Sequence, residues 1–276
     1  GDIIDEPFLE KIFCSSEFDA VIHLAGLKSV SESVQNPLLY YQNNVNGSIT
    51  LFKLMKKYKV NKVVFSSSAT VYGKPEYLPI DEIHKLAPVN PYGQTKLMIE
   101  NILKDLSMSS SKFSIVALRY FNPIGAHKSG LIGDSPNGLP NNIMPFISKV
   151  AKGKIAHLKV FGNQYSTIDG TGVRDYIHVS DLAAGHYNAL NYVVKNTNKF
   201  EVVNLGTGNG TSVLELISAY EQVNQVRVPY KIVKEREGDV GSCYAKVDKA
   251  NKLLGWKACR FIDDMCASAC NFENNI

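Results

Sequence analysis

Apolar segments alternate with amphipathic segments over the first half of the chain. Residues 19–26, 62–68 and 113–121 contain apolar runs of the length expected for strands buried on both faces of a sheet. Residues 37–58 and 92–106 place apolar side chains at the spacing of an amphipathic helix. Strands that alternate with helices in this way predict βαβ units and a parallel sheet.

The pattern becomes irregular after residue 122. Residues 123–142 are rich in Gly, Pro, Ser and Asn without a clear period, and such stretches are uncommon unless they are functional. Shorter elements follow, one of them a helix for which Asp181 is the expected N-cap. We expect helices at 143–152, 181–192, 211–222, 250–254 and 263–272, and strands at 158–161, 201–205 and 230–233. The pattern predicts an α/β protein in which a sheet domain carries a smaller, loop-rich cap.

Composition narrows the class of protein. The 276 residues, 45% apolar and 20% charged, are enough for one large or two small domains. The net charge of +4 is mild and no basic run occurs, so nucleic acid is not an expected partner. No apolar run approaches the roughly 20 residues of a membrane span. The five cysteines contain no zinc-type CxxC pair, so we expect reduced thiols in a cytoplasmic protein and no metal site.

Candidate chemistry lies where the strand at 62–68 ends and the helix at 92–106 begins. Tyr92 and Lys96 are four residues apart, so their side chains share one helix face. Ser68 ends the strand, at the sheet edge where open α/β sheets bind ligands. We interpret the three side chains as a proton-transfer site; the alternative is a surface Tyr beside a solvated Lys.

The Tyr-x-x-x-Lys spacing alone is weak, because two other pairs share it. Tyr58 and Lys62 are divided between a helix and a strand. Tyr230 and Lys234 lie along an expected strand, where residues four apart are too distant to reach one small group.

Three other features of the first half have a structural and a functional interpretation. His23 lies inside the first strand and is expected to be a satisfied core histidine. Gly26 ends that strand, where it allows backbone to approach a ligand closely. The polar segment 43–47 predicts either a network between helices or a ligand contact, because buried Asn side chains need partners.

Taken together and in order, these motifs closely resemble the UDP-glucose 4-epimerase family of extended short-chain dehydrogenases/reductases. The resemblance rests on HLAGLKSVSESV (23–34), NNVNG (43–47), SSSATVYG (66–73), PYGQTK (91–96), LRYFNPIGAH (118–127), PNNIMP (140–145), FGNQY (161–165), DGTGVRDYIHVSDLA (169–183) and REGD (236–239). The family's glycine-rich GxxGxxG turn is absent, and Gly1 looks like the end of a third strand. We therefore expect a fragment that lacks about 55–60 residues, or two βα units.

The resemblance implies the fold and the reaction. It implies a Rossmann-like doubly wound parallel sheet that binds NAD over 1–122, lacking its first part. Residues 123–276 would mainly form a smaller α/β cap that binds the UDP-sugar, with 169–208 returning to the sheet domain. The implied activity is the reversible interconversion of UDP-glucose and UDP-galactose, in galactose metabolism, by transient oxidation of C4 with bound NAD.

The resemblance also assigns roles to individual residues. Tyr92 would be the base for the 4-OH proton, Ser68 would hydrogen-bond the reacting oxygen, and Lys96 would hold the cofactor ribose. A base near pH 7 needs a tyrosine pKa about 3 units below its usual value of about 10, roughly 4 kcal/mol, and Lys96 has the right charge. Cofactor contacts would further include Asp2, Ile3, Leu24, Ala25, Gly26, Leu27, Lys28, Asn43, Tyr120 and Phe121. Substrate contacts would be Asn122, Asn141, Asn142, Ile143, Val160, Phe161, Arg174, Arg236, Asp239 and Cys243.

Several substrate assignments have a physical basis and an alternative. The guanidinium groups of Arg174 and Arg236 suit diphosphate oxygens, although both could instead form surface ion pairs. Phe161 can lie against uracil. Cys243 is small and leaves room for an acetamido group, which predicts additional activity on UDP-GlcNAc and UDP-GalNAc; the alternative is an inert buried thiol.

Family members form homodimers through two long helices, here 37–58 and 92–106. The apolar candidates for that interface are Leu51, Leu54, Met55 and Leu103, which could also face the sheet.

Three other functions remain open. A nucleotide-sugar 4,6-dehydratase needs an additional acid, and Ala69 and Thr70 stand where related dehydratases carry Asp-Glu. A nucleotide-sensing regulator would be expected to lack Tyr92 or Lys96. A fragment could also be inactive.

Overall fold

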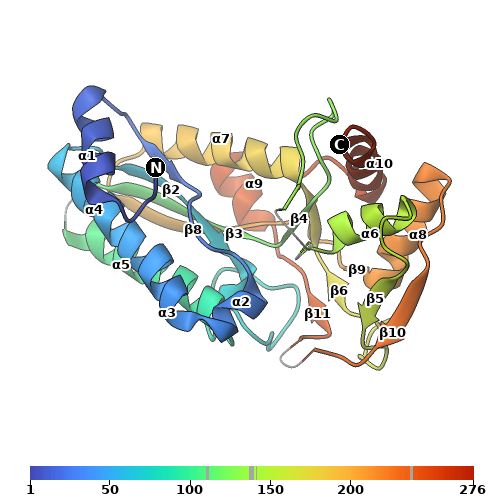
Figure 1. Cartoon of the computed structure of the whole chain (residues 1–276). Helices are drawn as coiled ribbons and strands as arrows, with labels where there is room; N and C mark the ends of the chain where they lie inside the picture. Colours follow the sequence, from blue (N-terminus) through green and yellow to red (C-terminus); the bar gives the residue numbers. More distant parts are fainter. Residues whose placement is uncertain (110–111, 137–139, 141, 237–238) are drawn as a thin grey trace. The chain divides into compact units, whose positions relative to one another are not determined.

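The main sheet has the strand order β1-β2-β3-β8 in the computed structural model of the chain (Figure 1), which describes residues 1–276 except 110–111, 137–139, 141 and 237–238. Its strands are β1 (Val21–His23), β2 (Lys62–Ser68), β3 (Ser114–Tyr120) and β8 (Lys199–Leu205). Strand β2 pairs in parallel with β1 and with β3. Val63, Val64 and Phe65 are fully buried, as expected for a parallel strand covered on both faces. The parallel sheet with intervening helices agrees with the predicted α/β class.

The chain divides into two compact units. Unit 1 comprises residues 1–74, 82–120 and 186–204, and unit 2 comprises 75–81, 121–185 and 205–276. Unit 1 contains the main sheet, and unit 2 contains several short strand pairs. The assignment of cofactor binding and sugar binding to sequence ranges stays a prediction.

Unit 1 packs its helices on a core that centres on Phe65. The helices are α1 (Glu6–Ser15), α2 (Val30–Gln35), α3 (Pro37–Tyr40), η1 (Tyr41–Asn46), α4 (Gly47–Lys57), η2 (Ala69–Val71) and α5 (Pro91–Ser109). Helix α5 lies beside α2, α3 and η1 (Figure 1). Leu51, Leu54, Met55 and Leu103 all belong to the buried core, so the prediction that they form a dimer interface is wrong. Exposed apolar residues on α3 and α5 include Leu38, Leu39 and Met98.

The helix predicted over 37–58 contains a π-helical segment, η1, between α3 and α4. Asn44 lies in η1 and is buried. Its side chain accepts from the Leu27 backbone N–H at 2.8 Å, donates to the Leu27 carbonyl at 3.0 Å and donates to Thr95 Oγ1 at 3.1 Å. Of the two interpretations of the polar segment 43–47, Asn44 therefore fulfils the structural one. Single π-turns inside helices are frequent near functional sites.

Unit 2 is built from short strands and five helices among its described residues. The parallel pairs are β4 (Asn122–Ile124) with β7 (Tyr176–His178) and β5 (Leu158–Phe161) with β10 (Tyr230–Val233). Strand β6 (Val173–Arg174) lies between β9 (Thr211–Ser212) and β11 (Ser242–Cys243). The helices are α6 (Ile143–Ala151), α7 (Val179–Lys195, which continues into unit 1), α8 (Val213–Asn224), α9 (Asp248–Leu254) and α10 (Ile262–Asn274). Its core includes Ile147, Tyr176, Leu216, Tyr220 and Met265.

Helices α7, α8 and α9 each begin two residues away from the predicted start. Helix α7 begins at Val179, and Asp181 is not its N-cap. The Asp181 carboxylate instead accepts from the backbone N–H groups of Cys259 and Arg260 at 2.9 Å and 2.8 Å. Helix α8 begins at Val213, because Ser212 and Glu215 form a reciprocal capping box. Within the described residues, no helix combines the length and apolar character that crossing a bilayer requires.

Candidate active site

The fold brings Ser68, Tyr92 and Lys96 together at the end of β2. Ser68 is the last residue of the strand, and Tyr92 is the second residue of α5. The hydroxyl of Ser68 and the phenol of Tyr92 are hydrogen-bonded. One turn along α5, the Lys96 ammonium lies 5.9 Å from the centre of the Tyr92 ring and donates to the Ser66 carbonyl at 2.6 Å. The arrangement is that of a proton-transfer site, and the roles of the three side chains stay a prediction.

Lys96 is a buried cation. Its residue is 4% exposed, and its ammonium lies 5.0 Å from the centre of the Phe65 ring. Burial lowers the pKa of Lys96 to about 8, while the nearby Glu100 carboxylate acts in the opposite direction. In the described part of the chain, its nitrogen donates to the Ser66 carbonyl alone. An ammonium has three N–H donors, so Lys96 retains capacity for a ligand hydroxyl.

The pKa of Tyr92 moves in the direction opposite to the sequence expectation. Burial raises the pKa of this phenol, and the hydrogen bond from Ser68 opposes the increase. The expected lowering by Lys96 is not seen, because the effect of burial on the phenol dominates. The chain alone therefore stabilises the neutral phenol.

Tyr120 ends β3 next to this cluster. Its hydroxyl forms a close hydrogen bond with Nε2 of His186 on α7, and the Ser66 side chain is a further partner. Burial raises the pKa of Tyr120, so it remains a neutral phenol. His186 carries no motif signal and was missed by sequence reasoning.

The remaining predicted cofactor residues of unit 1 follow β1 or precede α1. Leu24 to Lys28 form an exposed loop at the carboxyl end of β1, except that Leu27 is partly buried and held by Asn44. His23 is buried and hydrogen-bonded to Ser48 at 2.8 Å, and burial lowers its pKa to about 3, which confirms a satisfied core histidine. Asp2 is exposed and Ile3 is partly buried near Gly47, while Asn43 donates to Asn44 at 3.1 Å.

The predicted substrate residues of unit 2 include a cluster of charged and aromatic side chains. Arg174 on β6 is the register partner of Cys243 on β11, and its guanidinium lies 3.6 Å from the Asp239 carboxylate. The guanidinium of Arg236 lies over the Phe161 ring, 3.8 Å from its centre. Arg236 therefore covers one face of the Phe161 ring, the ring that is predicted to lie against uracil. Asp239 and Arg174 form a loose ion pair, as the alternative interpretation expected.

Tyr165 belongs to this cluster and was not assigned from the sequence. Its hydroxyl is buried and has no hydrogen-bond partner among the residues that the structure describes. The charged side chains that act on its phenol are Asp239, Glu235, Arg174 and Arg236. A buried polar atom without a partner is uncommon in folded proteins, so the Tyr165 hydroxyl is a candidate for contact with a ligand.

The other predicted substrate residues have separate local roles. Asn122 begins β4, and Phe121 before it is buried. Asn142 precedes α6 and donates to Asp134 at 2.8 Å, and Ile143 is the first residue of the helix. The Val160 side chain is 1% exposed in the core of unit 2, so the substrate contact predicted for Val160 stays a prediction that its backbone would have to fulfil. Asn141, and Glu237 and Gly238 of the REGD motif, lie outside the described residues.

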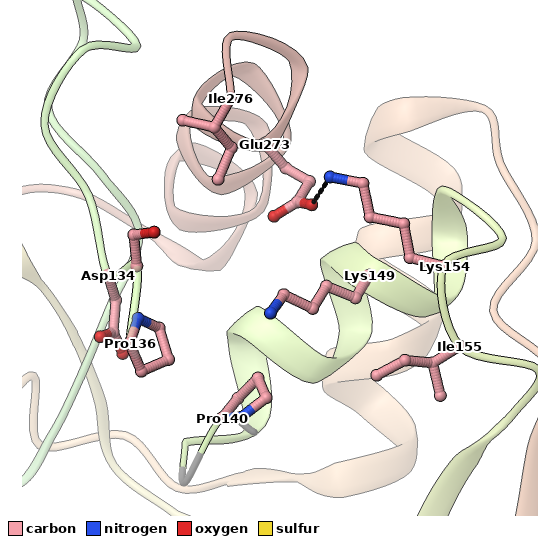
Figure 2. Close-up of a pocket in the computed structure, with 9 residues that line it drawn as sticks. Asp134, Pro136, Pro140, Lys149, Lys154, Ile155, Glu273 and Ile276 are labelled. Atoms are coloured by element: carbon pink, nitrogen blue, oxygen red, sulfur yellow. Dashed lines mark hydrogen bonds and ion pairs between the residues drawn. The ribbon is translucent and has the colours of Figure 1, made fainter. Parts of the chain in front are cut away.

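A hollow in unit 2 is separate from these residues. Figure 2 shows Lys149 and Lys154 on its wall, with Lys154 Nζ 2.8 Å from Glu273 Oε1. None of the predicted substrate residues lines it among those described.

Comparisons with known proteins place this geometry in a family. A family model described as GDP-mannose 4,6 dehydratase matches residues 1–269. UDP-glucose 4-epimerase of Bacillus subtilis is 52% identical over 275 residues, covering 100% of this chain and 81% of that protein. The chain belongs to the UDP-glucose 4-epimerase family.

Solved structures of the family superpose closely on the whole chain. That of the Bifidobacterium longum UDP-glucose 4-epimerase, in complex with NAD⁺ and UDP, has a TM-score of 0.96 and 50% identity over 100% of this chain and 82% of that one. The UDP-Glc/GlcNAc 4-epimerase of Campylobacter jejuni has a TM-score of 0.85 and 36% identity over 100% and 83%. These similarities confirm the predicted Rossmann-like fold.

The dehydratase description of the family model does not decide the reaction of this epimerase-family chain. Ala69 and Thr70 occupy η2, directly after Ser68. Neither side chain can protonate a leaving hydroxyl as a carboxylic acid does. Thr70 instead donates from its hydroxyl and its backbone N–H to Ser68 Oγ, at 2.9 Å and 3.2 Å. Thr70 therefore orients Ser68.

Proposed function

We propose that the protein interconverts UDP-glucose and UDP-galactose reversibly, as an NAD-dependent isomerase of galactose metabolism. The observation that carries the proposal is the buried cluster of Ser68, Tyr92 and Lys96, in a chain 52% identical to a named UDP-glucose 4-epimerase. The retained phenol and ammonium favour catalysis over a regulator that only senses nucleotide.

The residues of unit 1 fit NAD. The exposed loop from Leu24 to Lys28 lies at the carboxyl end of a parallel strand, where nucleotides bind in this class of sheet. Lys96 retains donors for a ribose hydroxyl. The residues that would hold the cofactor are Asp2, Ile3, Leu24, Ala25, Gly26, Leu27, Lys28, Asn43, Ser68, Lys96 and Tyr120, with Phe121 in unit 2. When bound, oxidised NAD accepts hydride from C4 of the sugar and its positive charge favours the tyrosinate form of Tyr92.

Three side chains of unit 1 handle the proton in this proposal. Tyr92 accepts the proton of the 4-hydroxyl as C4 is oxidised and returns it when C4 is reduced from the other face. Ser68, oriented by Thr70, hydrogen-bonds the same oxygen. Lys96 keeps a positive charge 5.9 Å from the phenol ring, which favours the developing phenolate.

The charged cluster of unit 2 fits the UDP part of the substrate. The guanidinium groups of Arg174 and Arg236 can each grip diphosphate oxygens with two hydrogen bonds. The unpartnered hydroxyl of Tyr165 offers a further donor. Phe161 lies against uracil in this proposal, and the guanidinium of Arg236 lies over the same ring, 3.8 Å from its centre. Asn122, Asn142, Ile143 and Asp239 complete the predicted substrate contacts.

Cys243 leaves room beside the 2-substituent of the sugar and so extends the substrate range to UDP-GlcNAc and UDP-GalNAc. It is the register partner of Arg174, which places the thiol beside the proposed diphosphate residue. Burial raises the pKa of Cys243 to about 11, so the side chain is a neutral thiol of small volume. The similarity to a UDP-Glc/GlcNAc 4-epimerase supports this extension.

An exposed apolar surface on α3, η1 and α5 supports a homodimer. Leu38 is 81% exposed and lines a shallow hollow together with Tyr41, Val45 and Met98. This surface replaces the buried leucines as the proposed contact. Light scattering at micromolar concentration should give twice the monomer mass, and a Leu38→Glu variant should give the monomer mass.

The five free thiols agree with the cytoplasmic location predicted from the sequence.

The test of the proposed activity uses the protein expressed from its complete reading frame. Denaturation of the purified protein should release NAD close to one per chain, and the native protein should convert UDP-galactose to UDP-glucose. A 4-keto-6-deoxy sugar as the product would show that the protein catalyses dehydration and not epimerisation. Absence of both NAD and turnover would contradict the proposal.

A further inference from the structure

A buried ion pair lies one helical turn beyond Lys96. Glu100 on α5 and Arg119 on β3 are 3% and 2% exposed. Arg119 donates from Nε to Glu100 Oε1 at 3.0 Å and from Nη2 to Oε2 at 2.6 Å. Ser67 Oγ also donates to Glu100 Oε1. A two-pronged contact of this kind fixes orientation as well as distance.

The guanidinium continues the network to two further elements. Arg119 Nη1 donates to the Tyr72 hydroxyl at 2.9 Å, and that hydroxyl donates to Asn204 Oδ1 at 2.6 Å. The Tyr72 ring lies 4.8 Å from the guanidinium carbon. Glu100 thus connects α5 directly to β2 and β3. Through Arg119 it also connects α5 to the segment after η2 and to β8.

The partners of Glu100 are the sequence neighbours of active-site residues. Ser67 stands between Ser66, whose carbonyl holds the Lys96 ammonium, and Ser68, which is bonded to the Tyr92 phenol. Arg119 precedes Tyr120, which ends β3 beside the same cluster. A shift of Glu100 would therefore displace Ser67 and Arg119. Each of these is adjacent in sequence to a residue of the active-site cluster.

Glu100 also continues the helix face of the catalytic residues. Tyr92, Lys96 and Glu100 are spaced at intervals of four, which aligns them along one face of α5. We infer that Glu100 is a positioning residue, whose carboxylate fixes this face of α5 on β2 and β3 and so holds Lys96 and Tyr92 against Ser68. The inference rests on the proposed epimerase reaction for its kinetic consequence.

A purely stabilising role does not account for the arrangement. Replacing a buried ion pair with apolar residues of similar size is often neutral or favourable for stability. The pair between Glu100 and Arg119 instead provides direction, because the described donors to the carboxylate, Ser67 and Arg119, lie on strands that end at the site.

Glu100 also provides the negative charge that Lys96 meets. Tyr92 shares α5 with both residues, Arg119 on β3 is paired with Glu100, and β2 contributes the neutral Phe65 ring and Ser66 carbonyl. His23 on β1 is neutral at physiological pH. Removal of the Glu100 charge should therefore lower the pKa of Lys96.

The experiment compares Glu100→Gln with the double variant Glu100→Gln/Arg119→Met in the full protein. The double variant removes both charges. It keeps the test valid if Glu100→Gln leaves Arg119 buried without a counter-charge and the protein does not fold. Glu273→Gln is the matched control. Glu273 is also a buried carboxylate in an ion pair, but its partner is a lysine and it lies in unit 2 (Figure 2). The readouts are kcat and KM for UDP-galactose over pH, the melting temperature, and amide exchange of the protein without cofactor.

We expect Glu100→Gln to lower kcat about 10- to 100-fold, with KM within threefold, because misplacement of about 1 Å is enough for such a loss. The alkaline limb of kcat should move to lower pH. Amides in Lys62–Ser68 and Pro91–Ser109 should exchange faster. Glu273→Gln should leave kcat, its alkaline limb and the exchange of these amides unchanged. The double variant should regain melting temperature without regaining kcat.

Two results would overturn the inference. One is a kcat of Glu100→Gln equal to that of the wild type. The other is a double variant in which kcat recovers together with the melting temperature, which would show that Glu100 acts through stability alone. An inactive wild-type protein would contradict the proposed function instead, and amide exchange in α5 and β2 would still decide whether Glu100 holds them.

Discussion

The catalytic cluster of unit 1 and the charged cluster of unit 2 are built in different ways. Lys96 is 4% exposed, and its short contact to a backbone carbonyl is fixed within a core. Arg236 is exposed, and Arg174 lies at 3.6 Å from Asp239, a loose distance for an ion pair. Groups that meet developing charge act best when already desolvated and oriented. Groups that capture a charged ligand can stay hydrated and exchange partners, because a hydrated ion pair is weak.

The largest expected effect comes from removing the oriented phenol of unit 1. Tyr92→Phe keeps the ring and removes the proton acceptor, so epimerisation should fall about 10²- to 10⁴-fold while NAD stays bound. A coupled assay for UDP-glucose and the NAD content measure both. Tyr230→Phe is the control, because Tyr230 shares the Tyr-x-x-x-Lys spacing but lies on β10. A Tyr92→Phe variant with the wild-type rate would remove the distinction between the two clusters.

The second effect tests whether unit 2 acts in binding alone. Arg174→Met and Arg236→Met should each raise KM for UDP-galactose about 10- to 100-fold, because a charge-assisted hydrogen bond contributes about 1.5–3 kcal/mol. Their kcat should change less than threefold. Arg227→Met, at an exposed arginine of unit 2, is the control. A large fall in kcat with unchanged KM would place these arginines in the chemical step and break the comparison.

The two clusters also differ in how far the sequence predicts them. Strands β2, β5 and β10 have the predicted bounds, since their apolar runs are short and delimited by turns. The spacing of Tyr92 and Lys96 is local, so helix geometry alone brings them together. The partnership of Glu100 with Arg119 joins α5 to β3, and no local pattern encodes such a contact. The same holds for His186 at Tyr120.

Local patterns also leave side-chain environments open. Leu54 and Met55 fit either a dimer interface or a core, because an amphipathic helix does not identify what covers its apolar face. The pKa of Tyr92 depends on the balance between burial and nearby charge, and that balance follows from packing. In unit 2, Arg236 covers Phe161, a contact between a loop residue and the last residue of β5 that no local periodicity predicts.

The third effect concerns substrate range. Cys243→Tyr should lower kcat/KM for UDP-GlcNAc about tenfold or more, because a phenol ring fills the space of the acetamido group, while the value for UDP-glucose stays within threefold. Cys270→Tyr on α10 is a control for the added ring volume. A wild type that ignores UDP-GlcNAc, or a Cys243→Tyr variant that still uses it equally well, would contradict the pocket assignment.

The smallest effect tests the energetic cost of the desolvated cation in unit 1. The folded-state pKa of Lys96 is about 8 and the unfolded value about 10.4, so below pH 8 the burial cost is fully present. Between these values the unfolded state binds more protons, and the stability of the wild type rises with pH. Lys96→Met should therefore be inactive but more stable at pH 7, by about 1 kcal/mol once the orphaned Ser66 carbonyl is subtracted. That advantage should shrink as the pH rises from 8 to 10, measured by urea unfolding against the surface variant Lys53→Met. An advantage that grows with pH would show that Lys96 is held as a stabilised cation, and the contrast between a strained catalytic centre and a relaxed binding cluster would fail.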